Sequence, residues 1–349
     1  MRLVAAVVLA GCSFQPRAAP GTGDAPTRSD APGTSDGTRD SASDASSDAF
    51  VQLDGPTHPA NWWNASWGSR MRLTIANTAT TAYVQGYQVG LPLDLDAAPC
   101  TGNRDQVRIV YQNQTDIPRV IDEVGTTEWT WFPLQAQIDA GASSTDYWLY
   151  CTNANPSAAL ADPATVFDVW DDFAGTSLGA MWTSQNSVSV GSGAVTIGAN
   201  GAIHSNATYG PNTAIDSMAT ASSASVSNPQ WWVGYETTFT VQAPWVVWLA
   251  SAPNQIHPSI NETGTRHEDT ASKLDTNPHL YGVENYGGTS AFRLADAIVD
   301  THTNTSNIGA LNLRLSVLQA GGTVSFDWVR VRKAVSPAPM VSVGTVETY

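Results

Sequence analysis

From residue 58 onward the chain consists of short runs of alternating apolar and polar residues that are separated by turn residues. Such runs lie at 71–75, 83–89, 107–111, 128–132 and 146–151. Side chains two residues apart share a face of a β-strand, and β-branched and aromatic residues are frequent in these runs, so the pattern predicts half-buried strands. No stretch shows a sustained helical period. We therefore predict an all-β protein built from antiparallel β-sandwiches.

The residues before this region have a different composition. From residue 13 to about residue 55 the chain consists almost entirely of Asp, Ala, Pro, Gly, Ser and Thr with a few Arg. So little apolar surface cannot offset the entropy of ordering the chain. We predict that residues 12–57 are a disordered linker, or tether.

The first residues contain a targeting pattern. Arg2 supplies a positive charge, residues 3–9 are apolar, and the run ends in Leu9-Ala10-Gly11-Cys12. This pattern resembles a bacterial lipoprotein signal, which implies that residues 1–11 are a signal peptide and that the thiol and amine of Cys12 are acylated. Several acyl chains anchor a protein stably to a membrane. Ser13 after the cysteine favours the outer membrane, so we expect a cell-envelope lipoprotein; an ordinary signal peptide with an incidental cysteine is the alternative.

Charge and hydropathy exclude two classes of protein. The net charge is −15, from 16 Lys and Arg against 31 Asp and Glu. A surface this acidic repels a phosphate backbone, so we expect no nucleic-acid partner. No run of about 18 apolar residues suggests a transmembrane helix.

We place the first folded domain at residues 58–165. Its motifs occur in the order of one known family: a Trp-rich opening, a strand with alternating Val, Arg and Ile, an Ile-Pro with a following Glu, and a Gly/Ser-rich turn before an aromatic strand. These are residues 62–75, 105–109, 116–123 and 140–150. The domain resembles the domain of unknown function 2341 family, which implies a β-sandwich module and no established activity.

Two cysteines remain in this domain once Cys12 is assigned to the lipid. Outside the cytoplasm, Cys100 and Cys151 are expected to form a disulfide. Closing a loop of about 50 residues stabilises a fold by ~4 kcal/mol in the chain-entropy model. A metal site or a catalytic thiol would need a histidine partner, and none lies nearby in the sequence.

We place the second domain at residues 166–349. It opens with Asp171-Asp172-Phe173 and a later Trp182, and a closing motif runs from Asp327 to Val331. Both motifs resemble concanavalin-like jelly rolls, an architecture shared by laminarinase-type glycosidases and laminin-G-like binding modules. The resemblance implies a structural Ca²⁺ held by Asp171 or Asp172 together with Asp327, since carboxylate oxygens suit that ion. The alternative is that Asp327 caps a turn or pairs with Arg330.

Catalytic patterns are absent from this second domain. Laminarinase-type enzymes carry two carboxylates on one strand spaced Glu-x-Asp-x-x-Glu, and no such run occurs. In the nearest acidic cluster, Glu268 and Asp269 are adjacent and would point to opposite faces of a strand. The Gly-x-Ser-x-Gly pattern at 175–179 lies in the jelly-roll opening and not between a strand and a helix. We therefore expect no catalytic residues.

Aromatic residues are the remaining candidates for binding. Trp231 and Trp232 are neighbours, and Trp245 and Trp248 are three apart, so each pair splits between the two faces of a strand. One ring of each pair could stack on a sugar, with Tyr281 and Tyr286 as companions; the favoured alternative is that a neighbouring domain covers the second face and both faces are packed. We expect a non-catalytic envelope lipoprotein that binds glycan or extracellular matrix; the alternatives are a scaffold that binds protein and a polysaccharide hydrolase.

Overall fold

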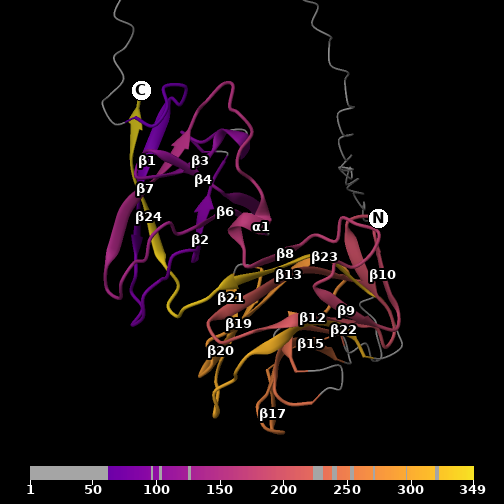
Figure 1. Cartoon of the computed structure of the whole chain (residues 1–349). Helices are drawn as coiled ribbons and strands as arrows, with labels where there is room; N and C mark the ends of the chain where they lie inside the picture. The colour runs from indigo at the N-terminus through magenta and orange to yellow at the C-terminus, as the bar shows by residue number, and fades with distance from the viewer. Residues whose placement is uncertain are drawn as a thin grey trace, which may run out of the picture. The chain divides into compact units, whose positions relative to one another are not determined.

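A computed structural model describes residues 62–349, apart from 96, 102–103, 125–126, 223–230, 238–241, 252–254, 270–271, 296 and 319–321. The predicted signal peptide, Cys12 and the whole of the predicted linker lie outside the described residues. Within the described part, no helix has the length and hydropathy needed to cross a membrane. The strands are antiparallel throughout and form two β-sandwiches, which confirms the predicted fold class (Figure 1).

The first sandwich pairs a five-stranded sheet with a three-stranded sheet. In order, the five-stranded sheet contains β24 (Met340–Thr348), β1 (Ser69–Ala76), β7 (Ser143–Cys151), β3 (Arg108–Tyr111) and β4 (Thr115–Ile117). The three-stranded sheet contains β2 (Gln88–Leu93), β6 (Thr127–Pro133) and β5 (Val120–Val124). A single 3₁₀ turn, η1 (Arg104–Gln106), precedes β3. Alternate residues of β1, namely Met71, Leu73 and Ile75, are buried in the core between the sheets, as the period-two pattern predicts.

The second sandwich consists of two eight-stranded sheets. One, which we call the junction sheet, has the order β10 (Val188–Gly191), β11 (Ala194–Ile197), β23 (Val324–Lys333), β13 (Thr213–Ala221), β19 (His279–Asn285), β20 (Thr289–Leu294) and β21 (Ala297–Thr303), with β8 (Val169–Asp171) also on β23. The other, the distal sheet, has the order β17 (Arg266–Glu268), β16 (Gln255–Asn261), β15 (Trp245–Ser251), β14 (Trp231–Glu236), β22 (Leu311–Val317), β12 (Ala202–Tyr209) and β9 (Trp182–Gln185), with β18 (Ser272–Lys273) also on β16.

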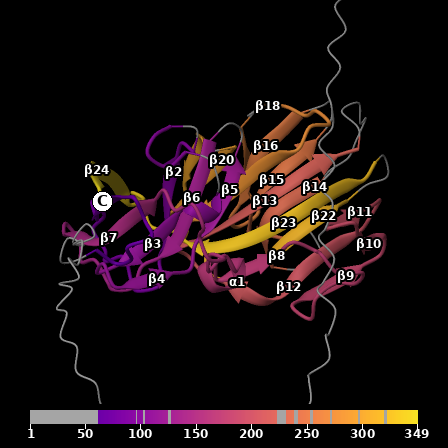
Figure 2. The same cartoon turned by 90° about the horizontal axis from the view of Figure 1, so that it is seen from above.

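The short helix α1 (Pro163–Val166) connects the two sandwiches. Asp162 caps its N-terminus by accepting a hydrogen bond from the Ala164 amide, and Pro163 occupies the first turn, where no amide donor is needed. The chain then enters the junction sheet through β8, which pairs with β23 (Figure 2).

The last strand departs from the predicted domain boundary. We assigned all of 166–349 to the jelly roll, but β24 leaves that domain and pairs with β1 of the first sandwich over Met340–Thr348 (Figure 1). The sequence motif at Asp327–Val331 closes the jelly roll, and the following proline-containing segment 334–339 carries the chain back. Because β1 and β24 are far apart in sequence, no local pattern indicates their pairing. Residues Pro56–Tyr349 accordingly form one compact unit.

Candidate functional site

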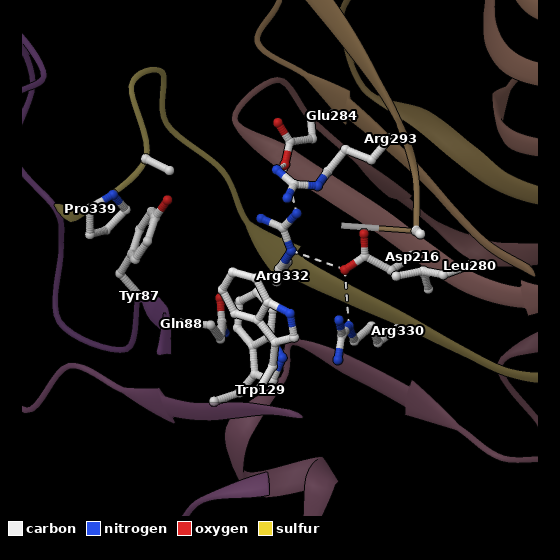
Figure 3. A pocket seen from close by; sticks show the side chains of 14 residues that line it. Tyr87, Gln88, Trp129, Asp216, Leu280, Glu284, Arg293, Arg330, Arg332 and Pro339 are labelled. Carbon is white, nitrogen blue, oxygen red and sulfur yellow. Dashed lines mark hydrogen bonds and ion pairs between the residues drawn. The ribbon is translucent and has the colours of Figure 1, made fainter. Parts of the chain in front are cut away.

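A cavity of ≈ 160 Å³ lies where the three-stranded sheet of the first sandwich meets the junction sheet of the second. One wall comes from β2 and β6, through Tyr87, Gln88, Gly90, Trp129 and Trp131. The opposite wall comes from β13, β19, β20 and β23, and the segment before β24 adds Ala338 and Pro339. Figure 3 shows the indole of Trp129 on one side of the cavity and the carboxylate and guanidinium groups of the junction sheet on the other.

The charged wall follows from the alternation of β23. Val329 and Val331 are fully buried in the jelly-roll core, so Arg330 and Arg332 are on the opposite face of the sheet, toward the first sandwich. Register places Asp216 of β13 directly opposite Arg330, and Asp216 Oδ2 accepts hydrogen bonds from Arg330 Nε at 2.9 Å and Arg332 Nε at 3.0 Å. A buried row of alternating charge results.

The row continues on both sides of Asp216. Arg332 Nη2 donates to Glu284 Oε1 at 2.6 Å, and Arg293 Nη1 lies 3.7 Å from the same oxygen. The hydroxyl of Tyr286 donates to the other oxygen of Glu284. On the far side, Arg330 also pairs with Asp122 of the first sandwich. The network therefore joins the two sandwiches and fixes the positions of its polar atoms.

The network changes the acidity of its members. Burial alone would raise the pKa of Asp216, but the adjacent Arg332 and Arg330 guanidinium groups outweigh it and hold that pKa well below its usual range. Burial would lower the pKa of Arg332, yet Asp216 and Glu284 raise it above its usual value. Asp216 is therefore ionised at any ordinary pH, and it can orient a ligand or accept a hydrogen bond but cannot act as a proton donor.

The aromatic wall is flat and partly open. Trp129 and Trp131 are stacked with ring centroids 5.8 Å apart and an interplanar angle of 24°. A Cβ atom at Gly90 would come within 2.9 Å of the Trp131 ring, so a glycine lets these rings lie across β2. Trp131 is held by its Nε1–H bond to Asp122 and by Arg330, whose Cζ lies 4.7 Å from its ring centroid. The Nε1–H of Trp129 is buried and finds no hydrogen-bond partner among the described residues.

These features define what the cavity can bind. A flat indole suits the C–H face of a small ring, and fixed carboxylates and guanidinium groups suit hydroxyl groups around its edge. The volume is below the ~300–1,000 Å³ typical of drug-sized ligands, so it accommodates one small ring rather than a long chain.

The four predicted stacking tryptophans are not on an open surface. Trp231 and Trp248 are buried in the core between the two eight-stranded sheets, where they pack edge-on against Tyr281, itself buried. Trp232 and Trp245 are on the opposite face of the distal sheet, as the spacing predicts, but are only 2% and 6% exposed. They pack together with Val247 and Leu249. The prediction of a stacking platform at these residues is therefore wrong, because every ring is covered.

Tyr286 is the one predicted binding residue near the cavity. It is half-buried, and its hydroxyl bonds to Glu284, which lines the cavity. Burial and the Glu284 carboxylate raise its pKa, so the hydroxyl stays protonated and holds Glu284 in place.

The predicted calcium ligands lie near one another on the junction sheet. Asp171 faces Val329 across β8 and β23, two residues from Asp327. The Asp171 carboxylate already accepts the Phe173 amide at 2.8 Å and the Trp182 indole N–H at 2.7 Å, and Asp172 accepts the Ala174 amide. The described residues contain no group of three His, Cys, Asp or Glu side chains that could hold a metal ion. Calcium binding at these aspartates stays a prediction.

The predicted disulfide is confirmed. Cys100 and Cys151 are bonded, with their Cα atoms 5.0 Å apart, and both are buried in the core of the first sandwich.

Sequence reasoning missed most of the cavity. Asp216 is a single charged residue in the otherwise uncharged strand Thr213–Ala221, and Glu284 is the same in His279–Asn285. Arg330 and Arg332 alternate with two buried valines. Charged residues that lie among apolar residues in these strands indicate a buried face that needs counter-ions, and the sequence carries this signal. The sequence does not indicate that this charged face lies opposite Trp129 and Trp131, because that depends on how the two sandwiches are arranged.

No protein-family model matches the chain, and no curated protein matches it. The assignment of the first domain to the domain of unknown function 2341 family and the lipoprotein signal therefore stay predictions.

Solved structures do resemble about half of the chain. An endo-β-1,3-glucanase from Pyrococcus furiosus is 13% identical with a TM-score of 0.40, over 49% of this chain and 95% of that one. A pseudo β-1,3-glucanase of Mycobacterium tuberculosis is 14% identical with a TM-score of 0.39, over 48% and 99%. A structure described with endo-acting O-glycanases of the human gut microbiota, which initiate mucin breakdown, is 16% identical with a TM-score of 0.38, over 48% and 100%.

At these identities the likeness concerns the fold, which is of the concanavalin-like jelly-roll type. The neighbours also correct our expectation from the sequence. We expected a protein that binds glycan or extracellular matrix without catalysis, whereas the three solved structures above are named as glucanases or glycanases, one of them a pseudo-glucanase. That expectation is withdrawn.

Proposed function

We propose that this protein acts on polysaccharides and that the cavity between its two sandwiches holds one saccharide unit of the chain. The observation that carries the proposal is the juxtaposition of Trp129 with the charged row of the junction sheet. Trp129 offers an aromatic face, and it lies opposite donors and acceptors that ion pairs keep in place. Sugar rings have an apolar face and polar edges, so they match both walls.

The charged wall supports this role because it is fixed before any ligand arrives. Arg332 is held by Asp216 and Glu284 together. Ordering these side chains on binding would cost affinity, and an existing network removes that cost. The aromatic wall is likewise fixed, since Trp131 is bonded to Asp122 and stacked on Trp129.

The test uses the full chain with a panel of polysaccharides that includes a β-1,3-glucan and a mucin O-glycan. Retardation in polysaccharide gels and release of new reducing ends are measured for the wild type, for Trp129→Ala and for Trp63→Ala. Trp63 is a matched control because it is another half-buried indole of the first sandwich and does not line the cavity.

We expect at least one polysaccharide to be retained or cleaved by the wild type, and the effect to fall by at least ~10-fold in Trp129→Ala, as for loss of ~1.4 kcal/mol of contact. Trp63→Ala should behave as the wild type. A wild type that neither retains nor cleaves any member of the panel, or a Trp129→Ala protein with full activity, contradicts the proposal.

We also propose that the chain is anchored in the outer membrane of the cell envelope through acylated Cys12, where a polysaccharide would be met. The lipobox-like residues 9–12 and the disulfide, which suits an oxidising compartment, support this. Mass spectrometry of the mature protein would detect the acyl chains on an N-terminal Cys12 peptide, and an unmodified Cys12 would contradict it.

A further inference from the structure

A second hollow lies on the outer face of the five-stranded sheet of the first sandwich. Its volume is ≈ 650 Å³, and residues of β1, β7, β24 and the turn between β3 and β4 line it. Because Met71, Leu73 and Ile75 of β1 point into the core, Arg70 and Arg72 point into this hollow. We call it the β1 groove.

The floor of the β1 groove is a stack of cations and aromatic rings. Register places Arg72 directly opposite Trp148, and Arg70 opposite Tyr150. The Cζ atoms of Arg70 and Arg72 lie 4.2 Å and 4.5 Å from the Trp148 ring centroid, within cation–π distance. Arg70 is nearly buried and is paired with Glu347 at 2.7 Å.

Arg72 differs from its neighbour in one respect. It is exposed, and the described structure gives it a cation–π contact but neither an ion pair nor a hydrogen bond. The chain has 31 acidic and 16 basic residues, so a guanidinium group with no carboxylate partner is unexpected. Contact with Trp148 fixes the plane of this group and leaves its N–H donors free for a carboxylate, which they can bind in a bidentate manner.

The rim of the groove carries groups that bind hydroxyls. Gln112 and Gln114 are exposed in the β3–β4 turn, where Gln112 and Asn113 have φ values of 49° and 56°. Asn113 is fixed by a hydrogen bond from the Tyr150 hydroxyl, and Thr145 adds a hydroxyl from β7. Amides and hydroxyls both donate and accept, so they suit a polyhydroxylated ligand.

From these observations we infer that the β1 groove binds a saccharide bearing a carboxylate, a uronic acid residue, with Arg72 as the carboxylate-binding residue. The inference rests on the proposed action on polysaccharide and adds its substrate class. The volume falls in the ~300–1,000 Å³ range of ligand sites, enough for a short stretch of sugar chain. Asp146 and Glu347 also line the groove, and the chain is acidic as a whole, so a densely charged polymer would be repelled. The groove therefore suits isolated uronates separated by neutral sugars.

The experiment compares two probes on the full chain, a xylo-oligosaccharide with one glucuronic acid branch and the same oligosaccharide without it. Affinities are measured by calorimetry at low and high salt for the wild type, Arg72→Gln, Arg72→Lys and Arg104→Gln. Arg104 is a matched control, since it is an exposed arginine of the same sandwich that pairs with Glu128 and does not line the groove.

We expect the wild type and Arg104→Gln to prefer the uronate probe by ~10-fold at low salt, the effect of one charge-assisted hydrogen-bonded contact. The preference should shrink at high salt. Arg72→Gln should remove the preference for the uronate probe. Arg72→Lys should keep only part of this preference, because an ammonium group lacks the planar N–H donors with which a guanidinium group binds a carboxylate in a bidentate manner. Equal affinity of the wild type for both probes, or a preference that survives in Arg72→Gln, overturns the inference.

Trp129→Ala separates the two proposals. If the junction cavity were not a saccharide site, this variant would retain polysaccharide normally, and the Arg72 result would still be readable from the preference for uronate. If the β1 groove were not a uronate site, the preference would be absent from every variant while Trp129→Ala still lost retention.

Discussion

Replacing Asp216 with Asn removes the anion on which two buried arginines converge. Asp216 is 3% exposed and accepts from Arg330 and Arg332 through a single oxygen. An amide in place of the carboxylate can still accept a hydrogen bond, but it has no negative charge to compensate the guanidinium groups of Arg330 and Arg332. Breaking a buried ion pair from one side costs about 3–5 kcal/mol.

This cost converts to a shift in melting temperature. Unfolding entropy is about 2.1 cal/mol/K per residue, which gives about 0.6 kcal/mol/K for the compact unit Pro56–Tyr349. The expected fall in Tm is therefore about 5–8 °C at pH 7, measured by scanning calorimetry. Asp300→Asn is the matched control, because burial and the nearby Asp269 raise the pKa of Asp300, so neutralising it should not lower Tm.

The pH dependence supplies a second, independent readout. The pKa of Asp216 is depressed in the folded protein, so its contribution is present above the unfolded pKa of about 3.9 and is lost as the pH falls below that value. The Tm difference between wild type and Asp216→Asn should thus narrow from pH 5 to pH 3. A fall of under ~1 °C at pH 7, or a difference that does not change with pH, would refute the reasoning.

Three further predictions concern the stability of each sandwich. Replacing Cys100 and Cys151 with Ser removes a disulfide between residues 51 apart and should destabilise the fold by ~4 kcal/mol. The variant should have a lower Tm than the wild type, and reducing agent should no longer change it. An unchanged Tm would contradict the stabilising role of the disulfide. Burial raises the pKa of Asp327, so its charge opposes folding at neutral pH, and Asp327→Asn should raise Tm. A lower Tm of Asp327→Asn, together with a lower Tm of the wild type when EDTA is added, would instead support calcium binding at Asp327. Glu262 accepts hydrogen bonds from Thr305 and Ser306, which outweigh burial and lower its pKa to about 2. Glu262→Gln should therefore lower Tm at pH 6, where the carboxylate is ionised, but not at pH 2. An equal fall in Tm at both pH values would count against a stabilising role of the carboxylate.

Much of the fold could be predicted from local patterns. The alternation at 71–75 and 107–111 matches β1 and β3, and the aromatic run at 128–132 lies within β6. Even the splitting of each tryptophan pair between two faces is correct, since Trp231 and Trp232 lie in different clusters. These features depend on the period of a strand, which the sequence carries directly.

Burial and long-range pairing could not be predicted in the same way. Alternation assigns Trp232 and Trp245 to the second face of their strands but does not say that other groups cover that face. The return of Met340–Thr348 to β1 joins strands from opposite ends of the folded region. The cavity combines Trp129 from one sandwich with Asp216 and Arg332 from the other, so it exists only when both sheets are placed.

The most direct measurement is the side-chain N–H spectrum of the tryptophans during titration with an oligosaccharide that the protein retains. Trp129 lines the cavity, so a sugar ring stacked on its indole should change the chemical shift of its Nε1–H in a saturable way. Its resonance can be assigned as the one missing from Trp129→Ala, and that of Trp63 should not move. A Trp129 resonance that stays fixed while the oligosaccharide binds would contradict a saccharide site in the cavity between the two sandwiches.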